Sequence, residues 1–108
     1  MSVRISYTEA QRTYRFASRT PGHPEVSITV DVEHVTAAPT DRWSGYTGIH
    51  GYDPRTNERV SLEVRHPKAP FSESYTIWAW SPTGARPVGW YESLDAAMWN
   101  AALSIARP

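Results

Sequence analysis

Cysteine is absent from this 108-residue sequence. Neither a disulfide bond nor a zinc site with thiolate ligands can form without thiols. Lysine is scarce as well, because Lys68 is the single lysine among 11 basic residues and the others are arginine. Two explanations of this bias stay open: planar recognition of carboxylates or phosphates by guanidinium groups, or a GC-rich genome.

Long apolar runs and net charge are also missing. No stretch approaches the roughly 18 apolar residues of a membrane helix, and residues 1–16 lack the apolar segment of a signal peptide. The 11 acidic residues balance the 11 basic ones, whereas a general nucleic-acid-binding protein is usually basic. We therefore expect a cytoplasmic protein that does not associate with membranes.

What the sequence contains is typical of a folded domain. Apolar residues make up 40% and charged residues 20%, which are ordinary values for globular proteins. A chain of this length matches one domain with one hydrophobic core, and we find no linker that would divide it. We predict a single domain over residues 1–108. Tryptophan, with five residues, is the amino acid in clearest excess.

Alternation of apolar and polar residues predicts β-strands along most of the chain. The alternation is strictest over residues 26–34, where valine and isoleucine share one side and polar residues share the other. Such a pattern is typical of an antiparallel strand with one solvent-facing side. Further strands are predicted over residues 3–7, 12–18, 43–52 and 59–64. Proline, glycine and Asx clusters predict turns at residues 19–25, 36–41, 53–57 and 66–72.

Residues 75–91 form a predicted hairpin that carries three tryptophans. Pro82 and Gly84 favour a three-residue connection with a bulge. The resulting alternation places Trp78, Trp80 and Trp90 on one face. Because proline has no N–H to donate, Pro87 predicts that the second strand lies at a sheet edge.

A helix is predicted from Leu94 to Ala106, with Ser93 as its N-cap. Its apolar stripe consists of small side chains, and close packing requires bulky partners opposite small ones. We therefore predict that the helix lies on a floor formed by Trp78, Trp80 and Trp90. This strand-strand-helix ending resembles the ends of HicB-type antitoxin domains and integrase arm-binding domains, a pattern too general to assign a family.

The predicted fold is α+β: a single antiparallel, strongly twisted sheet of about five to seven strands, with one C-terminal helix packed on one face. Whether the sheet closes partly into a barrel stays open. The glycines at positions 45, 48 and 51 lack the following Lys and Ser or Thr of a phosphate-binding loop, so we interpret them as sites of close backbone approach.

Aromatic residues are the main candidates for a protein contact. Trp99 and Leu103 lie four residues apart on the helix, away from its apolar stripe, and predict an outward patch for a partner or for a homodimer. The alternative is that an N-terminal segment covers Trp99. Trp43, Tyr46 and Tyr52 are further candidate anchors, because tryptophan and tyrosine are favoured in recognition surfaces.

Two other functions stay open. Arg4, Arg12, Arg15 and Arg19, with Tyr7, are candidates for a small basic and aromatic face that binds nucleic acid. A ligand or catalytic site around residues 41–53 would use Asp41, Ser44, His50 and Asp53. The four histidines lack the spacing of metal ligands on one element, and we expect no metal and no cofactor.

Elimination therefore favours a non-enzymatic protein-binding module. The sequence contains no nucleophile motif, paired carboxylates or metal-ligand motif that would indicate a reaction. The expected role is that of a small inhibitor, antitoxin, immunity protein or phage counter-defence factor, which acts by occluding a partner's surface through aromatic anchors.

Overall fold

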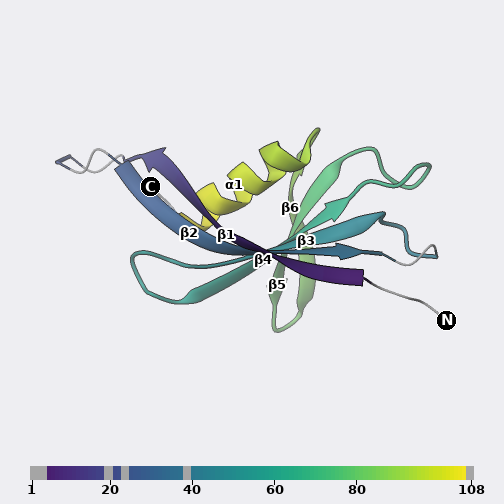
Figure 1. Cartoon of the computed structure of the whole chain (residues 1–108), viewed down its shortest axis with the longest axis horizontal. Coiled ribbons are helices and arrows are strands. Elements are labelled where there is room, and N and C mark those ends of the chain that lie inside the picture. The colour runs from purple at the N-terminus through teal and green to yellow at the C-terminus, as the bar shows by residue number, and fades with distance from the viewer. Residues whose placement is uncertain (1–4, 19–20, 23–24, 38–39, 107–108) are drawn as a thin grey trace.

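A computed structural model describes residues 5–18, 21–22, 25–37 and 40–106, and the side chains of residues 5–10 lie outside that description. The elements are β1 (Ile5–Ala17), β2 (Glu25–Thr36), β3 (Gly45–Tyr52), β4 (Arg59–His66), β5 (Tyr75–Ser81), β6 (Gly84–Tyr91) and α1 (Leu94–Ala106). The six strands form one sheet in chain order, and each is antiparallel to the next (Figure 1). This architecture confirms the predicted α+β fold.

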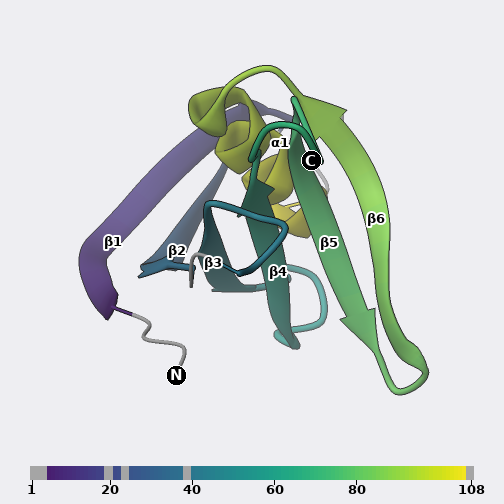
Figure 2. The same cartoon turned by 90° about the vertical axis from the view of Figure 1, so that its right-hand side faces the viewer.

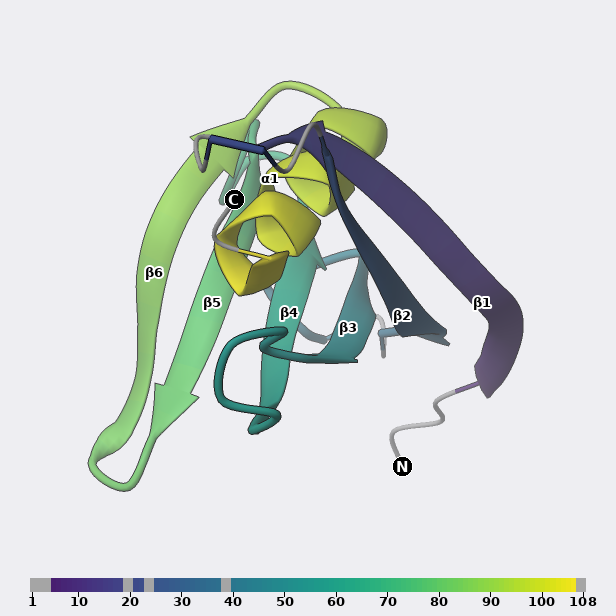
Figure 3. The ribbon, with the colours of Figure 1, turned by 90° about the vertical axis from the view of Figure 1, so that its left-hand side faces the viewer.

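The sheet curls around α1 without closing into a barrel. Its two edges, β1 and β6, stand on opposite sides of the helix (Figures 2 and 3). The helix lies on the concave side and contacts every strand of the sheet. We call the opposite side the open face, because no helix among the described residues covers it. None of the described segments forms a helix with the length and apolar content that a bilayer crossing requires.

Strand β1 is longer than predicted. The sequence pattern predicts separate strands over residues 3–7 and 12–18, whereas the structure has one strand with an extra residue between Glu9 and Arg12. This β-bulge shifts the alternation by one position and brings Phe16 to the helix side, where it is buried. The change from odd-numbered to even-numbered apolar positions therefore marks a bulge, not a turn.

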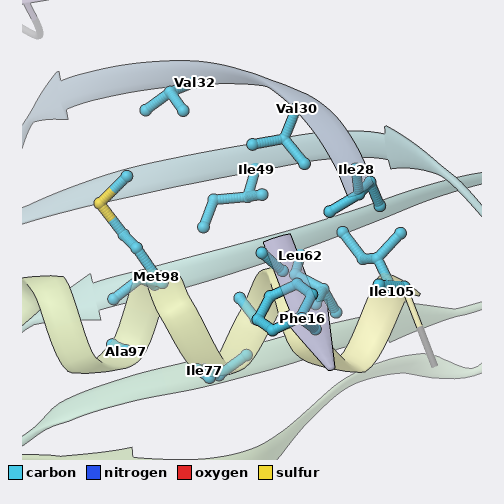
Figure 4. Close-up of a cluster of buried hydrophobic side chains, with 14 residues drawn as sticks. Phe16, Ile28, Val30, Val32, Ile49, Leu62, Ile77, Ala97, Met98 and Ile105 are labelled. Atoms are coloured by element: carbon cyan, nitrogen blue, oxygen red, sulfur yellow. The ribbon is translucent and has the colours of Figure 1, made fainter. Parts of the chain in front are cut away.

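The core lies between α1 and the concave side of the sheet. The helix contributes mostly small side chains: Ala97, Met98, Ala101, Ala102, Ile105 and Ala106. The sheet opposes them with larger ones: Phe16, Ile28, Val30, Val32, Ile49, Leu62, Val64 and Ile77 (Figure 4). The predicted match of small residues against large ones is thus present. Branched aliphatic side chains, with one phenylalanine, provide the bulk.

The predicted tryptophan floor beneath the helix is wrong. Trp80 and Trp90 are 59% and 63% exposed and lie on the open face. The helix side of β5 is instead formed by Ile77, which pairs with Val64 of β4 and is buried. Ile77 continues the aliphatic side chains that β2 to β4 present to the helix. An indole there would need a hydrogen-bond acceptor for its N–H.

The β5–β6 hairpin differs from the prediction in its turn. Ser81 pairs with Gly84, so the connection has two residues instead of three. Gly84 has a φ of +127°, a conformation that favours glycine. The bulge lies further along β6, at Val88, next to Pro87, which has no N–H to donate. As predicted, β6 is an edge strand.

The helix has the predicted bounds and the predicted cap. The hydroxyl oxygen of Ser93 accepts a hydrogen bond from the backbone N–H of Ala96, at 3.1 Å. The carbonyl of Ser93 accepts the first helical hydrogen bond from Ala97, at 3.1 Å. Local sequence therefore determines where α1 begins.

Candidate binding face and a buried histidine pair

Aromatic side chains gather on the open face of the sheet. We call this surface the aromatic face; it comprises Trp43, Tyr46, Trp78, Trp80 and Trp90. The strand register produces the cluster, because Tyr46, Arg65, Thr76 and Trp90 are successive cross-strand neighbours from β3 to β6. Trp78 and Trp80 follow Thr76 at every second residue of β5, so they lie on the same side.

Arg65 holds the inner part of the aromatic face together. Its guanidinium carbon lies 3.9 Å from the ring centroid of Trp78 and 5.9 Å from that of Trp43. Its Nε donates to a carboxylate oxygen of Glu63, at 2.9 Å. The indole N–H of Trp78 is buried and has no hydrogen-bond partner within the described part of the chain. Trp78 is therefore fixed by stacking, and not by a hydrogen bond.

The outer part of the aromatic face is open to solvent. Trp80 and Trp90 are mostly exposed, and Val88 between them on β6 is 47% exposed. The two indoles lie on neighbouring strands four register positions apart, a separation of about 13 Å along the hairpin. Their exposed area is roughly 300 Å² in total, which is comparable to the largest apolar patch on a typical monomer, a patch that is often functional.

The anchors predicted on the helix are partly covered. The Trp99 ring packs edge-on against Phe16 and Tyr14 of β1, with centroid distances of 4.6 and 5.9 Å. It stays 45% exposed. Leu103 is partly buried and packs against the core. Strand β1 therefore covers part of Trp99, and nearly half of the side chain stays open to solvent.

The three predicted anchors around β3 occupy different places. Trp43 and Tyr46 are half-buried on the aromatic face, and the Tyr46 hydroxyl donates to a carboxylate oxygen of Asp41 at 3.5 Å. Tyr52 is 55% exposed at the far end of β3, opposite Arg59. The structure thus brings Trp43 and Tyr46 together and leaves Tyr52 apart.

The predicted basic face on β1 is divided. Arg12 lies on the helix side, half-buried, with a guanidinium nitrogen 3.9 Å from the sulfur of Met98. Arg15 pairs with Ser27 and is exposed on the open face. Positions 12 and 15 are three residues apart, so their side chains point to opposite faces of any regular strand. The bulge of β1 is therefore not the cause of this separation. Arg4, Arg19 and the side chain of Tyr7 lie outside the described residues.

The polar constellation at residues 41–53 is dispersed. Asp41 and Ser44 precede β3 and Asp53 follows it, so the strand separates them by about 25 Å. The buried carboxylate of Asp53 accepts a hydrogen bond from the backbone N–H of Arg55, at 2.8 Å, and organises the turn into β4. His50 contacts Ser61 on the open face, at 2.8 Å. The described residues enclose no pocket.

A polar cluster that the sequence analysis missed lies on the helix side of the sheet. The hydroxyl oxygen of Thr47 is 2.9 Å from Nδ1 of His34 and 2.6 Å from Nε2 of His66. Thr47 is fully buried, and the His66 ring lies 5.4 Å from that of Tyr75. Burial, and then the neighbouring His34, lower the pKa of His66 below its usual value of 6.5. Only the pairing of β2, β3 and β4 reveals this cluster.

Comparison with known protein families, with curated proteins and with solved structures gives no match for this chain. No three His, Cys, Asp or Glu side chains within the described residues are grouped as metal ligands would be. The functional argument therefore depends on the surfaces that the fold itself presents.

Proposed function

We propose that this chain is a non-enzymatic protein-binding domain that uses the aromatic face, with Trp80 and Trp90 as its anchors. The observation that carries the proposal is the placement of these two indoles. The core beneath α1 is complete without them, and they lie exposed on a side of the sheet that no described helix covers. Large exposed aromatic residues in one patch favour a partner contact.

The charges around the aromatic face favour a protein partner over a nucleic acid. Arg65, the cation at its centre, is already engaged by Glu63 and by the Trp78 ring. Asp31 and Glu33 add negative charge on the open side of neighbouring β2. A surface that binds phosphates would need uncompensated cations there. Apolar anchors inside a polar rim are typical of protein–protein interfaces.

The proposed mechanism is occlusion. The sheet presents the anchors at a fixed backbone spacing, so little backbone entropy is lost on binding. Small inhibitors, antitoxins, immunity proteins and phage counter-defence factors act by covering a partner's surface, and the proposal places this chain in that class of cytoplasmic binding proteins.

The test is capture of a protein partner from the native host, followed by reconstitution with the purified partner. Wild type is compared with the double variant Trp80→Ser, Trp90→Ser. We expect the double variant to lose at least about 2 kcal/mol of binding free energy, as is typical of anchor residues. Tyr52→Ser is the matched control, because Tyr52 is similarly exposed but lies away from the aromatic face.

Three results would overturn this assignment. One is unchanged partner affinity in the double variant. Another is binding of a single-stranded oligonucleotide that weakens steeply with salt and depends on Arg15, which would favour the nucleic-acid alternative. The last combines two observations: size-exclusion chromatography shows a dimer that Trp99→Asp dissociates, and partner capture also depends on Trp99. Together they would mean that the contact surface lies on the helix.

A further inference from the structure

Thr47 links two histidines that come from strands on either side of it. His34 is near the end of β2, and His66 is the last residue of β4. Both imidazoles approach the same hydroxyl oxygen, at 2.9 and 2.6 Å. The connecting segments leave the sheet beside this cluster, where the backbone N–H of Ser44 donates to the carbonyl of His66 at 3.2 Å.

The shared hydroxyl brings the two imidazoles, and any charge they carry, close together. A threonine hydroxyl has one proton to donate, and its oxygen can accept hydrogen bonds. When one facing imidazole nitrogen is bare, Thr47 donates to it and accepts an N–H from the other ring. When both imidazoles are cations, the two lone pairs of the hydroxyl oxygen can accept both N–H groups, but the hydroxyl proton then has no acceptor on either ring. The two positive charges also repel each other across one buried oxygen.

We propose that His34, Thr47 and His66 form a proton-sensitive latch, which joins the ends of β2, β3 and β4 and opens when both imidazoles are protonated. The first proton is compatible with the bridge, because a singly protonated pair still offers one bare nitrogen to Thr47. The second proton destabilises it, because two cations then face each other across one buried oxygen.

The neighbouring elements carry other titratable and charged residues. Strand β1 places Tyr7 opposite His34 in the register, and β5 contributes Tyr75 beside His66. The connecting segments carry Asp41 and Lys68, and the Lys68 ammonium donates to the carbonyl of Asp41 at 3.0 Å. At the start of α1, Asp95 is exposed to solvent.

The direction of the response follows from proton linkage. Because the folded cluster lowers the pKa of His66, the open form binds more protons than the closed form below pH 6.5. Acid therefore opens the latch. The segments released are residues 40–44, which include Trp43 of the aromatic face, and residues 67–74.

The test is hydrogen exchange at the Ser44 amide, measured by NMR on the full chain and corrected for the intrinsic pH dependence of exchange. We expect its protection factor to fall by up to about tenfold per pH unit below pH 6.5, the limit for one additional proton. The Asp53 amide, which donates to the carbonyl of Glu58 at the other end of β3, is the internal reference. Its corrected protection should stay constant.

Two variants separate a proton effect from a structural one. His66→Gln keeps a side chain that can bond to Thr47 but cannot titrate, so we expect Ser44 protection that no longer depends on pH. His50→Gln removes a histidine that contacts a single hydroxyl, and it should keep the wild-type dependence. Constant Ser44 protection in wild type, or an unchanged dependence in His66→Gln, would overturn the proposal.

Discussion

Arg65 of β4 stacks over Trp78 of β5, with 3.9 Å between its guanidinium carbon and the ring centroid. The pair closes the inner part of the aromatic face and buries the indole N–H without an acceptor. Aromatic residues on the open side of this sheet therefore serve two purposes. Trp78 packs against Arg65 within the sheet surface, whereas Trp80 and Trp90 are exposed to solvent and available to a partner.

The stacking predicts a measurable coupling between Arg65 and Trp78. In a double-mutant cycle with Arg65→Met and Trp78→Leu, we expect an interaction free energy between about 0.5 and 2 kcal/mol, because the pair is only partly desolvated. Urea unfolding of the four proteins measures it. Arg65→Met preserves most of the aliphatic packing of the side chain. A coupling below about 0.3 kcal/mol would mean that the geometry contributes no cation–π stabilisation.

The exposure of Trp80 and Trp90 predicts that both can be replaced without loss of stability. We expect Trp80→Ser and Trp90→Ser each to change the free energy of unfolding by no more than about 0.5 kcal/mol, the usual range for exposed sites. Truncation of a buried tryptophan beneath the helix would cost about 3–5 kcal/mol instead. Thermal and urea denaturation distinguish the two values. A large loss of stability would mean that these tryptophans are buried beneath the helix.

Gly51 and Gly48 form a matched pair on β3. A Cβ at Gly51 would lie 3.0 Å from Cγ1 of Val30 in the packed core, whereas a Cβ at Gly48 would meet the end of the His50 side chain. We expect Gly51→Ala to destabilise the fold by about 1–3 kcal/mol through overpacking. Gly48→Ala should cost less, because the His50 side chain can move aside at the loss of its surface contact with Ser61. Equal urea midpoints for the two variants would contradict this packing.

The lowered pKa of His66 predicts how global stability depends on pH. The folded state disfavours protonated His66, so its contribution is complete above pH 6.5 and is lost as the pH falls toward the lowered folded value. We expect the urea midpoint to fall between pH 7.5 and 5.5 and to fall less in His66→Gln. Guanidinium chloride would screen the charges, so urea is the appropriate denaturant. Parallel pH profiles for the two proteins would contradict the prediction.

Local signals in the sequence predicted much of the fold. Alternation over residues 26–34 and 59–64 identified β2 and β4, and Ser93 together with the glycine-free segment after it identified α1. These predictions agree with the structure because alternating burial in a strand and capping of a helix depend on residues that are close in sequence. The bulge in β1 was mistaken for a break, since a shift of alternation looks the same in the sequence as the start of a new strand.

The candidate surfaces were not predictable in the same way. Alternation grouped Trp78, Trp80 and Trp90 correctly on one side of the hairpin, yet which side the helix covers is a property of the whole sheet. Ile77 lies on the same side of the sheet as the aliphatic core residues of β2 to β4. Contact between these strands, which are distant in sequence, determines which side of the hairpin α1 covers. The meeting of His34 and His66 at Thr47 likewise depends on strand order and register.

The sequence by itself determined the elements of this protein, because hydrophobic alternation, turn residues and a cap act over a few neighbouring positions. Only the tertiary structure decided which aromatic rings are buried and which are presented, because burial depends on the opposing layer. The helix covers the side where branched aliphatic residues from four strands meet its alanines, and the exposed indoles lie on the side that it leaves open.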